Sequence, residues 1–418
     1  MRTPRLADAD PMPWAVCALG ITQITAWGTS YYCLGVLAAP ISEDTGWTRS
    51  FVFLGFTVAL LVMGVVSPMV GRWIDGRGAR SVMCTGTLIV SAGLYLLSSV
   101  DGQIAYLLIW GALGLGMRMC LYDAAFAALV QVTPTRGRQA ISYLTLFGAF
   151  ASSVFWTLGH QLEATLGWRE TLLWFALINL VICLPLNWMG LARREQPGRQ
   201  QVAPTPGRVV ERAPLRGATR RLAMLLFALI MSLNGFVFGV VSVQLVPILE
   251  GAGLATAAAV WVASLKGVAQ FVGRVVEILF GRNLRAITIA RIAIGVLPLC
   301  IALLLLAAGN YVALLLFTLI MGASQGVITI VRGAVPLALF GSEGYGTVLG
   351  LIATPVLLVN ATAPTLFALI VDRWGWRSGE LVLLISSASA WLAMELMSRW
   401  YERASSNTAS SAELRPPS

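Results

Sequence analysis

The sequence has unusually few charged residues. Asp, Glu, Lys and Arg make up 11% of its 418 residues, whereas a soluble globular domain has about 25%. By contrast, 57% of the residues are hydrophobic, and they gather in apolar runs that recur along nearly the whole chain. A helix needs about 20 apolar residues to cross a bilayer. The shortage of charge therefore excludes an ordinary water-soluble protein and predicts a surface that faces lipid.

The sequence also lacks the residue patterns of metal, nucleotide and catalytic sites. It has one histidine, His160, and six cysteines that all fall within apolar runs without the spacing of metal ligands. It has no glycine-rich loop followed by lysine, which argues against a pump driven by nucleotide hydrolysis. We therefore expect no metal, no cofactor and no catalytic residue, and we do not expect an enzyme.

The apolar runs predict an all-α integral membrane protein with twelve transmembrane helices. The expected spans are 14–40, 50–71, 81–100, 104–131, 139–162, 170–191, 222–248, 255–280, 286–308, 311–340, 347–371 and 378–401. Several contain Gly or Pro, which membrane helices tolerate because packed neighbours satisfy the freed backbone groups. The first run is too long for the core of a signal peptide, so we expect it to remain in the protein as a helix.

The net charge of +10 is distributed in a way that indicates membrane topology. Most Lys and Arg outside the spans fall in alternate loops, on the same side as both termini. By the positive-inside rule this side is cytoplasmic. The strong preference for Arg over Lys is typical of a GC-rich genome, so we expect a bacterial inner membrane. The basic excess therefore does not call for a nucleic-acid partner.

The chain divides at a polar segment near its middle. Residues 192–221 are rich in Arg, Pro and Gly and predict a flexible cytoplasmic linker. This segment separates two six-helix bundles, 14–191 and 222–401. The flanking segments, 1–13 and 402–418, are expected to be cytoplasmic, and the second, with its cluster of serines, is expected to be disordered.

The two halves repeat each other. Short motifs recur in order and at nearly constant spacing: Gly28, Pro40 and Gly46 as Gly235, Pro247 and Gly253; Val-Gly-Arg-Trp-Ile-Asp at 70–75 as Val-Gly-Arg-Val-Val-Glu at 272–277; and Gly-Trp-Arg at 167–169 as the same tripeptide at 375–377. Three matches in order indicate a parallel duplication. Transporters built from such repeats bind their substrate near the bilayer midplane, between the halves.

The loop after the second span resembles the signature loop of the major facilitator superfamily. Gly71, Asp75, Gly78 and Arg80 match its pattern, whereas Gly76 stands where a basic residue is usual. The resemblance covers the whole chain and implies a secondary transporter with two pseudo-symmetric six-helix bundles, acting as a monomer. Within the superfamily, the run GVLAAPISEDTGWTRSFVF resembles the monocarboxylate and oxalate/formate porters.

The same loop contains the candidate gate, which comprises Gly71, Asp75, Gly78 and Arg80, with Glu277 in the weaker second copy. Asp75 follows the cytoplasmic end of the second span. There it can accept hydrogen bonds from an arginine or from the N-terminus of a facing helix. Such a contact would hold the halves together on the cytoplasmic side. Alternatively, Asp75 and Arg80 only end the helix at the membrane interface.

Three cations fall well inside the predicted spans, away from the span ends, where a charge costs roughly 2.5–3.5 kcal/mol. They are Arg118, Lys266 and Arg332, and one acid, Asp123, lies near the first of them. Asp123 is five residues from Arg118, about 140° around a helix, so we expect no simple pair within the helix. A cavity with this positive excess attracts anions. Each cation has an alternative role, as a strut between helices or as a snorkelling side chain.

Polar and aromatic residues on otherwise apolar helices predict the lining of a cavity. They are Gln23, Trp27, Tyr31, Tyr122, Asn234 and Gln325. Together with Arg118, Arg332 and Lys266 they form the predicted substrate site, and Asp123 is the candidate proton carrier because burial raises the proton affinity of a carboxylate. For the aromatic residues, packing is the alternative.

These features predict a secondary active transporter that moves a small organic anion, such as a monocarboxylate, by alternating access with proton coupling. Its partners are then the lipid bilayer and the solute. The alternative is an efflux transporter for drugs or other toxic compounds. The fifth span lacks the Gly-Pro-x-x-Gly pattern of drug/proton antiporters, and this disfavours the alternative.

Overall fold

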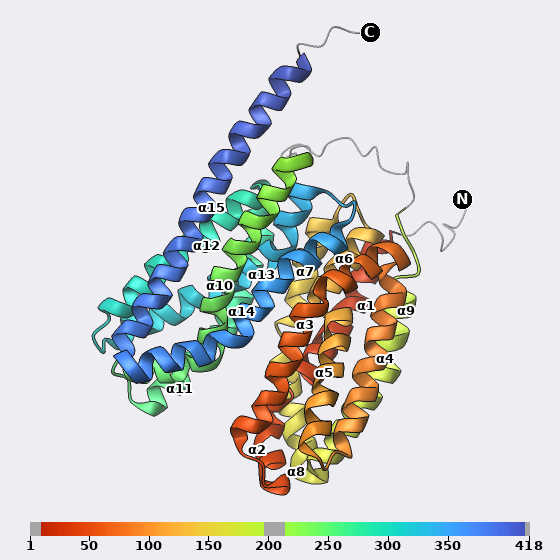
Figure 1. The fold of residues 1–418 in the computed structure, drawn as a ribbon, viewed down its shortest axis with the longest axis vertical. Coiled ribbons are helices and arrows are strands. Elements are labelled where there is room, and N and C mark those ends of the chain that lie inside the picture. Colours follow the sequence, from red (N-terminus) through yellow and green to blue (C-terminus); the bar gives the residue numbers. More distant parts are fainter. Residues whose placement is uncertain (1–9, 196–213, 414–418) are drawn as a thin grey trace. The chain divides into compact units, whose positions relative to one another are not determined.

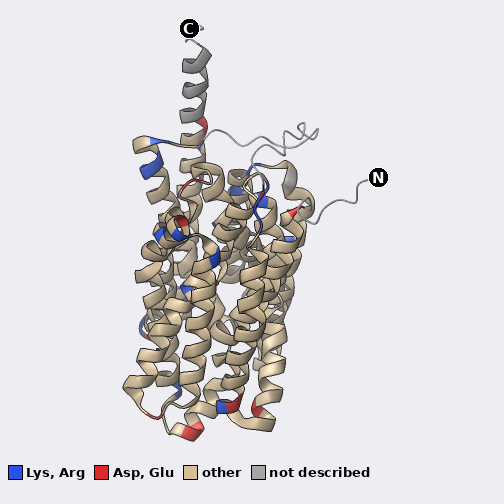
Figure 2. Ribbon diagram, turned by 90° about the vertical axis from the view of Figure 1, so that its right-hand side faces the viewer, with Lys and Arg blue, Asp and Glu red and all other residues tan. Residues whose placement is uncertain are grey.

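The computed structural model describes residues 10–195 and 214–413, and every regular element in these ranges is a helix (Figure 1). The chain forms two compact units, Met1–Thr205 with Ser342–Leu358, and Pro206–Gly341 with Val359–Ser418. The all-α fold expected from the apolar runs is confirmed. Along their middle lengths the helices have few charged residues (Figure 2).

The first unit contains the helices before the linker. They are α1 (Pro11–Ala26), η2 (Trp27–Tyr31), α2 (Leu34–Thr45), α3 (Arg49–Arg77), α4 (Ala79–Ser98), α5 (Gln103–Cys120), α6 (Tyr122–Val132), α7 (Gly137–Gly148), α8 (Ala151–Ile178), η3 (Asn179–Cys183) and α9 (Leu184–Gly190). Thr48 caps the long helix α3 by accepting a hydrogen bond from the Phe51 amide. Gly78, with φ of 85°, ends it.

The second unit contains the helices after the linker. They are α10 (Gly217–Gly251), α11 (Thr256–Phe280), η4 (Gly281–Asn283), α12 (Ala286–Leu306), α13 (Tyr311–Phe340), the later part of α14 (Tyr345–Trp374) and α15 (Trp376–Glu413). Asn310 caps α13 through the Ala313 amide. Helix α11 packs tightly along α13, where a Cβ at Gly273, Gly322 or Gly326 would collide with facing backbone.

Within residues 10–195 and 214–413, ten helical stretches are long and apolar enough to cross a membrane. One of them, Gly137–Gly190, is 54 residues long and covers two predicted spans, 139–162 and 170–191. Non-helical backbone at Gly167, with φ of 83°, interrupts it between the two. The first predicted span, 14–40, is divided among α1, the π-helix η2 and α2, so it does not form one long α-helix. The number twelve stays a prediction.

Large apolar side chains are exposed along these helices, among them Val65, Ile104, Leu299 and Leu306, which are 69–80% exposed. Such exposure is unfavourable in water and suits hydrocarbon. The chain is thus a multi-pass membrane protein.

Two predicted boundaries differ from the structure. The linker was expected to continue to residue 221, but α10 begins at Gly217, and the expected disordered tail is helical from 402 to 413 as the end of α15. Ala, Glu and Arg at these positions are good helix formers, and an established helix is extended at low cost once nucleated. Residues 196–213 and 414–418 of these segments lie outside the described residues.

The beginning of α14 belongs to the first unit, although the sequence places it in the second half. Three glycines explain this difference. A Cβ at Gly71 of α3 would overlap the backbone of Gly346, and a Cβ at Gly350 of α14 would overlap the carbonyl of Ser67. Close backbone contact of this kind requires small residues, as membrane helix interfaces commonly do.

Candidate functional site

A break between α5 and α6 lies near the middle of the long helical stretch Gln103–Val132. Leu121 has extended backbone, with φ of −82° and ψ of −170°. Arg118 and Asp123 lie on opposite sides of this break. Their side chains form an ion pair, with 3.7 Å between Nη1 and Oδ2.

This ion pair corrects the expectation that Arg118 and Asp123 do not pair. The expectation assumed one continuous helix, in which residues five apart point in different directions. The extended residue Leu121 resets the helical phase, and Asp123 then faces Arg118. The pair is buried, with Arg118 2% and Asp123 7% exposed. A second polar contact holds the guanidinium, since its Nε donates to Ser67 Oγ at 2.5 Å.

Gln23 supports the same break from α1. Its Nε2 donates a hydrogen bond to the carbonyl of Cys120 at 2.8 Å. The last carbonyls of a helix have no partner within the helix, so Gln23 satisfies one that the break exposes. Its Oε1 accepts a hydrogen bond from Trp27 Nε1 at 3.2 Å. A fully buried glutamine therefore connects the break to an aromatic group.

The aromatic group contains three of the predicted lining residues. The ring centroids of Trp27 and Tyr31 are 4.7 Å apart, and those of Trp27 and Tyr122 are 5.1 Å apart. Phe56 of α3 packs edge-on against Tyr31. Trp27 and Tyr31 lie on the π-helix η2, and π-helical turns are frequent at functional sites. The structure thus brings Gln23, Trp27, Tyr31 and Tyr122 together beside the Arg118–Asp123 pair.

The predicted site residues of the second unit are more dispersed. Asn234 of α10 is buried. Gln325 of α13 is 2% exposed, and neither its Nε2 nor its Oε1 has a hydrogen-bond partner. Arg332 lies two turns further along α13 and is half-buried. Lys266 of α11 has its Nζ 5.7 Å from the Phe238 ring centroid, a cation–π distance.

The carboxylate of Asp75 caps the N-terminus of α14. Its Oδ1 accepts a hydrogen bond from the Gly346 amide at 2.9 Å, and its Oδ2 accepts from the Thr347 amide at 2.7 Å and from Thr347 Oγ1 at 2.6 Å. A negative charge at a helix N-terminus is stabilised by the free amides and the helix dipole. Of the two partners that the sequence allows, the structure shows the helix N-terminus. Tyr345, the first residue of α14, is buried and lies within electrostatic range of Asp123.

The other residues of the candidate gate have different surroundings. Gly71 lets α3 approach α14, and Gly78 provides the turn into α4. Arg80 lies over the Trp188 ring of α9, 3.6 Å from its centroid, so its stacking contact is with α9. Glu277 is buried on α11 one turn after Arg274, which is buried as well.

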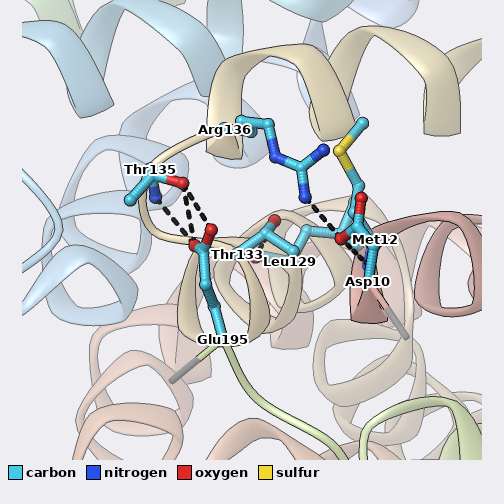
Figure 3. A network of polar contacts seen from close by, with 7 residues as sticks. All are labelled: Asp10, Met12, Leu129, Thr133, Thr135, Arg136 and Glu195. Atoms are coloured by element: carbon cyan, nitrogen blue, oxygen red, sulfur yellow. Dashed lines mark hydrogen bonds and ion pairs between the residues drawn. The ribbon is translucent and has the colours of Figure 1, made fainter. Parts of the chain in front are cut away.

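A second polar network joins the start of α1, the α6–α7 loop and the beginning of the linker (Figure 3). Arg136 pairs with Asp10, which also accepts a hydrogen bond from the Met12 amide at 3.1 Å. The hydrogen bond from Arg136 lowers the pKa of Asp10 below its ordinary 3.8. Glu195 accepts from the Thr135 hydroxyl at 2.7 Å. This network joins the start and the end of the first bundle to the α6–α7 loop.

Sequence reasoning did not identify Ser67, Phe56 or Tyr345 as parts of the site. Ser67 lies in an apolar stretch of α3 where a lone serine commonly bonds to its own backbone, as it also does here to Met63 at 2.8 Å. Only the fold brings it to Arg118. Two hollows on the described surface lie elsewhere: one of about 640 Å³ beside α12 and α15, and one of about 280 Å³ beside α3, α4 and α5.

Known proteins resemble this chain at the level of family and of fold. The family model described as Major Facilitator Superfamily matches residues 19–304. No curated protein matches the sequence.

Three solved structures have similar folds. The human organic anion transporter MFSD10 (TETRAN) is 15% identical, with a TM-score of 0.72 over 92% of this chain and 100% of its own. The proton:xylose symporter XylE is 12% identical, with a TM-score of 0.70 over 92% of this chain and 95% of its own. A bacterial homologue of the iron transporter ferroportin is 13% identical, with a TM-score of 0.75 over 92% of this chain and 99% of its own. At these identities the likeness concerns the fold.

Proposed function

Because the chain belongs to the major facilitator superfamily, we propose that it is a proton-coupled secondary transporter of a small organic anion such as a monocarboxylate. One observation carries this proposal: the buried Arg118–Asp123 pair at the α5–α6 break. The solute would bind there and cross the membrane by alternating access. Nothing in this role requires a catalytic step.

The pair links proton binding to anion binding. In the present arrangement Asp123 neutralises Arg118, and the two charges cancel. When Asp123 takes up a proton, Arg118 is left with a positive charge in a buried position, which is costly without a counter-ion. A substrate carboxylate provides that counter-ion, and a guanidinium binds a carboxylate with two parallel hydrogen bonds. Anion and proton would therefore bind together.

The neighbouring side chains suit a small organic acid. Trp27, Tyr31 and Tyr122 give an apolar aromatic wall, and Gln23 holds Trp27 in place. An aromatic wall around one fixed cation favours a short organic group that ends in a carboxylate. In the second unit, Arg332, Lys266, Asn234 and Gln325 are the proposed further contacts, and the unsatisfied amide of Gln325 is available for a polar group of the substrate.

The contact of Asp75 with α14 provides a gate for this mechanism. Helix α14 begins in the first unit and continues through the second. Release of the Asp75 cap would free its N-terminal turns to move with the rest of the helix. Tyr345 directly precedes Gly346 and lies within electrostatic range of Asp123, so protonation of Asp123 would change the electrostatic environment at the start of α14. In the proposed topology this side of the protein and both termini are cytoplasmic, in a bacterial inner membrane.

Measurements of binding and of transport should distinguish the role of Arg118 from that of Asp123. A thermal-shift panel of short carboxylates, aromatic acids and amphipathic drugs on the purified protein should give a stabilising carboxylate. With that compound, proteoliposome uptake should be lost in Arg118→Ala. Asp123→Asn should still bind the compound, with affinity that no longer changes with pH, but should not accumulate it in response to a proton gradient.

Asp101→Asn is the matched control, because Asp101 is an exposed acid of the same unit. It should transport as the unaltered protein does. Normal uptake by Arg118→Ala would show that the anion does not bind at this pair. Stabilisation by drugs and not by carboxylates would favour an efflux transporter.

A further inference from the structure

A charged groove lies on the second unit, whereas the Arg118–Asp123 site belongs to the first. It is a hollow of about 640 Å³ between α12 and α15, and its floor contains Arg291, Glu395 and Arg399. Glu395 accepts two hydrogen bonds from Arg291, from Nε and Nη2, both at 2.8 Å. It accepts a third from Nε of Arg399 at 3.1 Å. Two cations thus share one carboxylate, which leaves the groove with a net positive charge.

The arginines retain donors for a further ligand. A guanidinium has five N–H groups, and these bonds use two in Arg291 and one in Arg399. The side chain of Arg399 is 68% exposed and that of Arg291 is 35% exposed. The unused N–H groups can therefore reach an anion that enters the groove from the surface.

The sides of the groove are apolar and exposed. Its wall residues include Ile292, Trp391, Leu392 and Leu396, which are 41–68% exposed. Trp391 packs against Gly295 of α12. Apolar side chains at this exposure suit hydrocarbon chains, and tryptophan is enriched where headgroups meet hydrocarbon.

The depth of the charges in the membrane matches a lipid headgroup. Glu395 lies nineteen residues after Trp376, the first residue of α15, which is about 29 Å at 1.5 Å per residue. The hydrocarbon core is about 30 Å thick. The charged floor therefore lies where one leaflet ends, about midway along α15, and Arg291 lies within two turns of the start of α12.

We infer that this groove binds an anionic phospholipid, with the phosphate held by Arg291 and Arg399 and the acyl chains along Ile292, Leu392 and Leu396. Two arginines attract the phosphate as bidentate donors. The single carboxylate of Glu395 orients both guanidinium groups and reduces their attraction for the phosphate, so the bound lipid can exchange. The inference does not depend on the proposed transport function.

Native mass spectrometry of the purified full chain tests this inference by counting retained phosphatidylglycerol against phosphatidylcholine. The unaltered protein should retain phosphatidylglycerol in preference. Arg399→Gln should lower its affinity about fivefold, the effect expected of one basic residue at a lipid surface. Glu395→Gln should raise it, because both guanidinium groups are then released from their shared carboxylate. A role in packing alone would not produce this gain.

Arg221→Gln is the matched control, since Arg221 is an exposed arginine of α10 in the same unit. It should leave lipid retention unchanged. An equal loss in Arg221→Gln would show general surface attraction and overturn the inference. So would unchanged retention in Arg399→Gln, displacement of the lipid by inorganic phosphate at millimolar concentration, or a mass that shows a second copy of the chain in place of lipid.

Discussion

The two units carry corresponding segments that end in an acid, and the two acids have different surroundings. In the first unit, the repeated motif ends in Asp75, which is exposed and caps α14. In the second unit it ends in Glu277, which is buried on α11 near the buried Arg274. The same sequence pattern therefore yields a contact with another helix in one unit and a buried acid in the other. A repeat in sequence does not imply a repeat in role.

The helices that face these motifs pack alike but differ in charge. Gly114 of α5 lies against the backbone of Ala59, and its counterpart Gly322 of α13 lies against the backbone of Lys266. Close helix packing is thus common to both units. The ion pair and the helix break follow only in the first, where Arg118 and Asp123 stand at the positions that correspond to Gly326 and Val331. Both units have this close helix packing, but the charged pair at these positions distinguishes the first unit from the second.

The largest expected effect comes from breaking the ion pair. Arg118→Gln leaves Asp123 buried without its cation, and this should destabilise the protein by about 3–5 kcal/mol. The double variant Arg118→Gln with Asp123→Asn should recover most of that loss, because two neutral amides have no charge to bury. Thermal unfolding in detergent measures both. A single variant as stable as the parent protein would mean that the pair has no structural role.

The next effect concerns helix packing, which both units share. Gly71→Val should destabilise by about 1–3 kcal/mol because its side chain meets the backbone of α14. Gly273→Val should do the same against Ala323 of α13. Gly76→Ala is the control in the same helix, since a Cβ there meets nothing within 4 Å. Equal unfolding temperatures for Gly71→Val and Gly76→Ala would contradict the close approach.

Replacing Asp75 should have a smaller effect, which replacing Glu277 should not reproduce. Asp75→Ala removes the cap of α14, for which about 1 kcal/mol is typical. Hydrogen exchange of the amides of Gly346 and Thr347 should then become about fivefold faster, as followed by mass spectrometry. Glu277→Ala should not change exchange at these two amides. Unchanged exchange in Asp75→Ala would show that α14 does not need this cap.

The smallest effect concerns Asp10 of the first unit. Arg136 lowers the pKa of Asp10 in the folded protein, so the pair stabilises the fold at pH values above the ordinary pKa of 3.8. This stabilisation is lost as the pH falls below 3.8 and Asp10 becomes protonated. Since Asp10 is partly exposed, Asp10→Ala should cost under about 1 kcal/mol at pH 7. The difference in unfolding temperature from the parent should shrink as the pH falls below 3.8; a constant difference would exclude the pair as its cause.

Much of the fold could be predicted because membrane helices have a strong sequence signal. The apolar runs were sufficient to predict an all-helical membrane protein, and the resemblance of the loop at 71–80 to the signature loop indicated this superfamily. The contact between Asp75 and a helix N-terminus could also be anticipated, because an acid at a helix end has few favourable partners. The predictions were weaker where a helix is interrupted, since nothing in the residues around Leu121 indicates extended backbone.

For the candidate site, sequence periodicity found individual residues but not their partners. Gln23, Trp27, Tyr31 and Tyr122 were predicted as lining residues and do gather in one place. The pairing of Arg118 with Asp123 was predicted wrongly, because a regular helix was assumed across Leu121. Ser67 could not be found at all, since its contact with Arg118 joins residues 51 positions apart.

The sequence by itself determined that this protein lives in a membrane, because hydrocarbon accepts only helices whose backbone groups are satisfied internally. It also shows the repeated motifs and the position of the Asp75 loop. Only the tertiary structure decided which charges meet. An ion pair depends on a few ångströms of separation and on the phase of each helix, and a single extended residue between α5 and α6 changes both.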